Sequence, residues 1–111
     1  QYWRELTNQE LEMARAARRS GNEGRARVCA RRAAGHVIGE YLTRNEIDLG
    51  TESALERLRF LYSYHDTNHS QKELIGHFLV HTTPEHKLPI DADLVAEVDL
   101  LARQLLGETL P

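Results

Sequence analysis

The sequence predicts an all-α protein, folded as a single up-and-down bundle of about five helices. Apolar residues recur every three or four positions in five stretches, and polar or glycine- and proline-containing segments separate these stretches. No stretch shows the strict alternation that is typical of a half-buried strand. A length of 111 residues suits one domain with its own core, so residues 1–111 are interpreted as a single helical domain.

The composition is that of a soluble globular protein, with 41% hydrophobic and 28% charged residues. Cys29 is the only cysteine, so no disulfide can form within the chain, and a reducing, cytoplasmic location is expected. No apolar run approaches the roughly 18 residues that a membrane-spanning helix needs, so no membrane partner is expected. We expect no cofactor.

The first two helices are predicted to form a long antiparallel hairpin. The first covers residues 3–20, or starts at Thr7, which has capping-box spacing to Glu10. Gly21 ends it, and a loop over residues 21–24 leads to a second helix over residues 25–43. Because this loop is short, the two helices should lie side by side.

The second helix is predicted to be central, because both of its sides are suited to packing. One side carries a stripe of small and apolar residues: Ala26, Cys29, Ala30, Ala33, Ala34, Val37 and Tyr41. The opposite side carries Val28, Gly35, Gly39 and Leu42. A glycine inside a helix costs about 1 kcal/mol relative to alanine. Gly35 and Gly39 are therefore predicted to mark a close approach, either by a helix of the same chain or by a second copy in a homodimer.

Three shorter helices should complete the bundle. The third covers residues 51–65 with Thr51 as N-cap, and it is predicted to be buried through Leu55, Leu58, Leu61 and Tyr62. The fourth opens with a Ser70–Glu73 capping box, and it is predicted to be buried through Leu74, Ile75, Phe78 and Leu79. Residues 82–90 form a proline-containing loop. The last helix is capped by Asp91 or Asp93, ends at Gly107, and faces inward through Leu94, Val98, Leu101 and Leu105.

Charge is distributed unevenly along the chain. The net charge is −3, but residues 1–44 hold nine arginines against five glutamates. The arginines gather around the predicted hairpin turn, and the candidate anion- or nucleotide-binding residues are Arg18, Arg19, Arg25, Arg27, Arg31 and Arg32. A helix start flanked by guanidinium groups suits a phosphate, a nucleotide or an RNA backbone. The alternative is that these arginines pair with acidic residues of the second half or of a partner chain.

The segment LEMARAARRSGNEGRARVCARRAAGHVIGEYL resembles the first helical hairpin of HEPN domains, the higher eukaryotes and prokaryotes nucleotide-binding family. The shared features are an alanine-rich first helix, a small-residue turn and a second helix that ends in Tyr-Leu. Helical-repeat hairpins look similar, but no 34-residue period follows here. The resemblance implies a small helical bundle of the toxin–antitoxin type, often dimeric, with a nucleotidyltransferase-like protein as a possible partner.

A second segment, Gly76 to His81 (GHFLVH), looks like the Arg-Asn-x-x-x-His element of HEPN ribonucleases. His81 matches the family histidine, which would act as general base on the 2′-hydroxyl of RNA. Gly76 stands where the arginine belongs and His77 where the asparagine belongs. Metal-free RNA cleavage also needs a cation to stabilise the charge that develops on the phosphate, and Gly76 cannot supply one.

These observations predict a non-catalytic HEPN-like module that binds a protein partner, or a nucleotide or RNA phosphate, through the arginine-rich face. The alternatives are a metal-independent endoribonuclease with His81 as base, and a structural dimerisation domain. The pairs His65/His69 and His77/His81 have the four-residue spacing that can chelate a metal. They are interpreted as surface or helix-end histidines, and no metal site is predicted.

Overall fold

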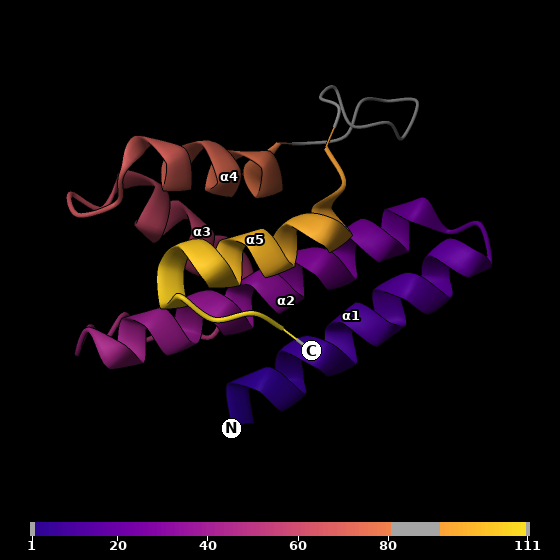
Figure 1. Cartoon of the computed structure of the whole chain (residues 1–111), viewed down its shortest axis with the longest axis horizontal. Helices are drawn as coiled ribbons and strands as arrows, with labels where there is room; N and C mark the ends of the chain where they lie inside the picture. The colour runs from indigo at the N-terminus through magenta and orange to yellow at the C-terminus, as the bar shows by residue number, and fades with distance from the viewer. Residues whose placement is uncertain (1, 81–91, 111) are drawn as a thin grey trace.

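The computed structural model describes residues 2–80 and 92–110, and this part of the chain folds into helices without strands (Figure 1). The elements are α1 (Tyr2–Arg19), α2 (Glu23–Arg44), α3 (Ala54–Ser63), α4 (His69–Leu79) and α5 (Leu94–Leu106). The predicted all-α class and five-helix organisation are confirmed. No helix in the described ranges is long and apolar enough to cross a membrane.

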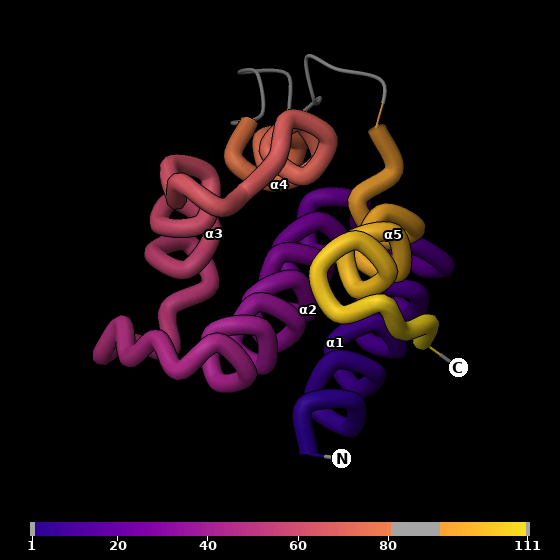
Figure 2. Tube along the Cα trace, turned by 60° about the vertical axis from the view of Figure 1, so that its left-hand side comes forward, coloured from indigo at the N-terminus to yellow at the C-terminus, as the bar shows by residue number. Residues whose placement is uncertain are grey.

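Helix α2 is the centre of the bundle, as its two-sided sequence predicts. It packs against α1, α3 and α5, whereas α4 packs against α3 and α5 (Figure 2). Each helix contacts the next one along the chain, and α5 also touches α1. The α1–α2 hairpin is the most extensive of these contacts. The short α1–α2 link explains why these helices are neighbours.

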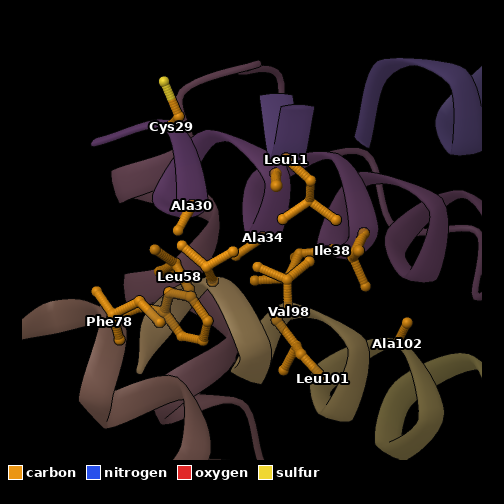
Figure 3. Packing of buried hydrophobic residues seen from close by; sticks show 14 of the residues in the cluster. Leu11, Cys29, Ala30, Ala34, Ile38, Leu58, Phe78, Val98, Leu101 and Ala102 are labelled. Carbon is orange, nitrogen blue, oxygen red and sulfur yellow. The ribbon is translucent and has the colours of Figure 1, made fainter. Parts of the chain in front are cut away.

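The alanine-rich side of α2 forms the centre of the core (Figure 3). Ala26, Cys29, Ala30, Ala33, Ala34 and Val37 are all fully buried, and only Tyr41 of the predicted stripe remains partly exposed. Small side chains on α2 let α1 and α5 approach it closely. The other helices contribute Leu11, Phe78, Val98 and Leu101 to the core.

The opposite side of α2 is only partly covered. Helix α3 meets α2 at Gly35 and Gly39, where Ala54 and Arg57 lie against the two glycines. Val28 lies two turns before Gly35 and is 44% exposed, so its predicted burial is wrong. Leu42 is buried as predicted.

The starts of the first two helices differ from the predicted ones. Helix α1 already includes Tyr2, so Thr7 is not its N-cap; the buried Thr7 hydroxyl instead donates to the carbonyl oxygen of Trp3 at 2.7 Å. Helix α2 begins at Glu23, because the side chain of Asn22 accepts the backbone N–H of Arg25.

Helix α3 is shorter than predicted. Its N-cap is Ser53 rather than Thr51, whose hydroxyl accepts the N–H of Ser53 at 3.1 Å and so shapes the preceding turn. Leu58 and Leu61 are buried as predicted, but Leu55 is 40% and Tyr62 is 47% exposed, so their predicted burial is wrong. These two residues are seven apart and share one side of α3, which is turned away from the core.

Helix α4 opens with a capping box two residues earlier than predicted. The Asn68 side chain accepts the N–H of Gln71, and the Gln71 side chain accepts the N–H of Asn68, while Ser70 and Glu73 are exposed. Both pairs have the same three-residue spacing, and spacing alone could not distinguish them.

Helix α5 begins and ends at predicted residues. Asp93 caps it by accepting the N–H groups of Val95 and Ala96, and Gly107 ends it at a φ of +67° in the left-handed region. Asp91 and the predicted loop over residues 82–90 lie outside the described residues.

Candidate functional site

The structure divides the predicted arginine cluster into two groups, and Arg18 belongs to the internally paired one. Its Nη2 lies 2.6 Å from Oε1 of Glu23 and 3.1 Å from Oδ1 of Asp93. The hydrogen bonds to Glu23 and Asp93 raise the pKa of Arg18. The hydrogen bond from Arg18 in turn lowers the pKa of Asp93. Arg18 therefore joins α1, the start of α2 and the N-cap of α5.

Arg31 and Arg27 also turn inward. The Nε of Arg31 donates to the carbonyl oxygen of Phe78 at 2.9 Å, and its Nη2 donates to that of Val80 at 3.1 Å. Carbonyl groups at a helix end lack intrahelical donors, so Arg31 caps the C-terminus of α4. Burial lowers the pKa of Arg31, and the nearby charge of Arg27 lowers it further. Arg27 itself is 8% exposed.

The second group consists of Arg19, Arg25 and Arg32, whose side chains are exposed. In the described ranges, none of the three forms an ion pair. Arg25 and Arg32 are seven residues apart and share one side of α2. Arg19 ends α1, and with Arg15 it lines a shallow hollow of about 330 Å³. Three of the six predicted anion-binding arginines thus remain available to a ligand. We call them the hairpin arginines.

The N-terminus of α2 already has a hydrogen-bond acceptor and an acidic side chain from the same chain. Asn22 accepts the N–H of Arg25 at 3.0 Å, and Glu23 places a carboxylate in the first helical turn. An acidic side chain at this position complements the helix dipole. The predicted use of this helix start as an anion site therefore has no support, and only the guanidinium groups around it remain as candidates.

The predicted catalytic residue, His81, lies outside the described residues. Its two partner positions are described. A Cβ atom added to Gly76 would lie 3.3 Å from Cε1 of Tyr62, so this position faces an aromatic ring across the α3–α4 contact. His77 Nδ1 lies 2.6 Å from Oε1 of Glu97, and this bond links α4 to α5. Both positions therefore make interhelical contacts.

The described histidines do not assemble a metal centre. His65 lies 3.5 Å from Asp66, His69 lies 4.0 Å from Glu73, and all four side chains are largely exposed. Across residues 2–80 and 92–110, no three histidine, cysteine or acidic side chains gather closely enough to hold a metal ion. His86, like His81, is outside these ranges.

The sequence did not predict a polar groove that the structure shows between α1, α2 and the start of α3. It has a volume of about 410 Å³. Helix α1 contributes aromatic and apolar residues to it, and most of its other lining residues are polar; the lining consists of Tyr2, Trp3, Leu6, His36, Gly39, Glu40, Thr43, Glu52 and Arg57. A second hollow of about 400 Å³ adjoins it and shares Gly39, Thr43, Glu52 and Arg57.

Gly39 lines this groove, and Gly35 lies one turn earlier on α2, where α3 begins. A Cβ atom at Gly35 would lie 2.6 Å from the Cβ of Ala54, and one at Gly39 would lie 2.5 Å from Nη1 of Arg57. Gly35 thus admits the backbone of α3, and Gly39 admits a guanidinium group. The glycine pattern predicted a close approach on this side, but no sequence signal identified Arg57 as the residue that fills it.

His36 lies on the same groove. Burial lowers its pKa from the ordinary value of 6.5; Glu10 opposes this shift, Arg57 adds to it, and Glu52 opposes it. The imidazole is therefore neutral at pH 7, with one nitrogen able to donate and the other able to accept a hydrogen bond.

No protein-family model, curated protein or solved structure matches this chain. The HEPN resemblance therefore stays a prediction from the sequence.

Proposed function

We propose that this chain is a non-catalytic, HEPN-like cytoplasmic module that binds the phosphate groups of RNA through the hairpin arginines. One observation carries the proposal: Arg19, Arg25 and Arg32 are exposed and form no ion pair with another described residue, whereas Arg18 and Arg31 have partners in the chain. Guanidinium groups suit phosphate, because their planar N–H groups can donate to two of its oxygens.

The overall charge of −3 makes this local distribution important. An acidic protein repels RNA at long range, so binding requires a surface where positive charges are not neutralised. Glu23 separates the hairpin arginines along the chain, but its carboxylate is engaged by Arg18. Because Arg18 binds Glu23, this carboxylate is not paired with a hairpin arginine.

Two contacts support a binding role over RNA cleavage. Gly76 occupies the place of the family arginine, and Tyr62 lies beside it. His77 occupies the place of the family asparagine, and it is bound to Glu97. Neither position supplies the cation that would stabilise the developing phosphate charge.

The glycine side of α2 gives no support to a homodimer through Gly35 and Gly39. Ala54 and Arg57 of the same chain already occupy this surface. A second copy, or a nucleotidyltransferase-like protein partner, would have to dock elsewhere on the bundle.

Fluorescence anisotropy with a labelled single-stranded RNA tests the proposal. The double variant Arg25→Glu/Arg32→Glu should bind about tenfold or more weakly, because two charge-assisted contacts are lost. Each lost phosphate contact should also lower the slope of log affinity against log salt by about 0.7. Arg59→Glu is the matched control, since Arg59 is an exposed arginine on α3 away from the hairpin.

Unchanged RNA affinity in the double variant would refute the proposed surface. The recovered RNA should be intact after incubation with chelator. Cleavage that disappears in His81→Ala would instead establish the ribonuclease alternative.

A further inference from the structure

We propose that Arg57 forms a binding site for the anionic group, carboxylate or phosphate, of a small ligand held in the groove between α1, α2 and the start of α3. This site is separate from the hairpin arginines and does not depend on RNA binding. It is carried by three observations: the fixed position of the guanidinium, its unused donors, and the size of the groove in front of it.

The guanidinium of Arg57 is held against α2. Its Nη1 donates to the carbonyl oxygen of Gly35 at 3.0 Å, and its Nε donates to that of Thr51 at 3.2 Å. The position of a Cβ on Gly39 lies only 2.5, 2.9 and 3.3 Å from Nη1, Cζ and Nη2. One face of the group therefore rests on the glycine, and any side chain at this position would displace it. A preorganised guanidinium loses little entropy when an anion binds.

These two bonds leave other N–H groups of Arg57 without an acceptor among the described residues. A guanidinium has five N–H groups, and those on Nη2 make no hydrogen bond with the described residues. No carboxylate in the described ranges lies within ion-pairing distance of Arg57. Partly buried arginines usually have an anionic partner. A ligand anion would supply one.

The groove has the dimensions of a small-molecule site. Its volume of about 410 Å³ lies in the range of roughly 300–1,000 Å³ that is typical of such sites, and the adjoining hollow extends it past Arg57. Tyr2, Trp3 and Leu6 of α1 contribute aromatic and apolar surface to its lining, which suits the carbon skeleton of a ligand.

His36, Glu40 and Glu52 also line the groove. His36 is neutral and can donate one hydrogen bond, whereas Glu40 is engaged by Arg44 at 2.8 Å. Glu52 is exposed at the edge of the groove, where its charge opposes anion binding and would attract a ligand ammonium group. Trp3, which lines the groove, has a buried Nε1 without a hydrogen-bond partner in the described chain.

Trp3 makes the site measurable, because it is the only tryptophan in the chain and lines the groove. Sodium glutamate and inorganic phosphate are titrated separately, with sodium chloride at matched ionic strength as the control. The proposal expects a saturable change in tryptophan fluorescence with at least one of the two anions and none with chloride. The anion that binds more tightly identifies the ligand as a carboxylate or a phosphate.

Variants then assign the binding to Arg57. Arg57→Gln should weaken affinity about tenfold or more, because it removes a charge-assisted bond. Arg59→Gln, an exposed arginine on the same helix, should leave affinity unchanged. Gly39→Ala keeps the arginine but displaces its guanidinium, and it should also weaken binding. Glu52→Gln should strengthen anion binding severalfold, because the repelling charge at the edge is removed.

Circular dichroism tests whether each variant is folded. If Arg57→Gln does not fold, Gly39→Ala and Glu52→Gln decide the question, because both variants keep Arg57 in the chain. The proposal is overturned if neither anion gives a saturable change, or if Gly39→Ala binds as tightly as the unaltered chain. Loss of RNA binding in Arg25→Glu/Arg32→Glu has no bearing on this result.

Discussion

The two sides of α2 show how one methyl group changes what a helix surface can hold. On the alanine side, Ala30 and Ala34 are fully buried against Phe78 and its neighbours, and the contact is apolar (Figure 3). On the glycine side, Gly39 accepts a guanidinium, and a polar groove opens beside it. Ala30 and Ala34 therefore give an apolar contact, whereas Gly39 leaves room for a partly buried polar group.

Two partly buried arginines, Arg31 of α2 and Arg57 of α3, are used differently. Arg31 donates to carbonyls that end α4, so it completes a helix terminus. Arg57 donates to two carbonyls and keeps both Nη2 hydrogens unused by the described residues. The first arginine is a structural cap, and the second is a structural group with remaining capacity to bind.

The largest effect should come from the apolar side. Phe78 is fully buried, and Phe78→Ala should lower the free energy of unfolding by about 3–5 kcal/mol, because it removes apolar contacts and leaves a cavity. Chemical denaturation measures this loss. Phe60→Ala, at a partly exposed phenylalanine, should cost clearly less. Equal losses would mean that the apolar centre does not lie on the alanine side.

Gly35→Ala should be the most damaging alanine substitution on the glycine side. The new Cβ would lie 2.6 Å from the Cβ and 2.9 Å from the Cα of Ala54, so the backbone of α3 must move. We expect a net loss of about 1–3 kcal/mol in denaturant unfolding, despite the better helix propensity of alanine. A stabilised variant would show that α3 does not pack directly on Gly35.

Arg31→Ala should cost about 1–3 kcal/mol, because it leaves the carbonyls of Phe78 and Val80 without their donor. Arg32→Ala is the matched control, since the neighbouring Arg32 is exposed, and it should change stability little. Hydrogen exchange should locate the change at the end of α4. Equal effects of the two substitutions would argue against the cap.

Gly39→Ala should change stability by no more than about 1 kcal/mol, in contrast to Gly35→Ala. Here the new Cβ meets the guanidinium of Arg57 and no backbone atom, so only this side chain has to shift, and the gain in helix propensity offsets the lost contact. Comparing the two alanine variants by thermal unfolding tests this distinction. A loss as large as that of Gly35→Ala would mean that the position of Arg57 is essential to the fold.

The smallest effect concerns pH. Because burial lowers the pKa of His36 below 6.5, the unfolded chain binds a proton more readily than the folded one. The contribution of His36 to stability is therefore present above pH 6.5 and is lost as the pH falls below this value toward the folded pKa. His36→Asn should flatten the stability profile in this window. An unchanged slope between pH 7 and 5.5 would contradict the shift.

Helix ends illustrate the limits of local patterns. The start of α5 was predicted at Asp91 or Asp93 and its end at Gly107; Asp93 and Gly107 hold these positions, since a cap residue and a left-handed glycine act within a few residues. Thr51 and Ser70 were predicted as caps with the same reasoning, and Ser53 and Asn68 hold these positions instead. Several residues at each start could have capped a helix, and packing of the helix that follows selected among them.

The candidate sites were also only partly predictable from the sequence. The arginine-rich hairpin was visible in the sequence, because charge and helix spacing are local properties. Which arginines remain exposed was not visible, since Arg18 meets Asp93 and Arg31 meets Val80 across long stretches of chain. The groove at Arg57 was likewise hidden, because it joins α1, α2 and α3.

The sequence by itself determined the helical class, the central position of α2 and the existence of a close contact at Gly35 and Gly39. These properties follow from periodicity and side-chain size, which act along a single helix. Only the tertiary structure decided what fills that contact and which charges are neutralised. The physical reason is that ion pairs, caps and grooves depend on distances between side chains of different helices, and these distances are set when the helices pack.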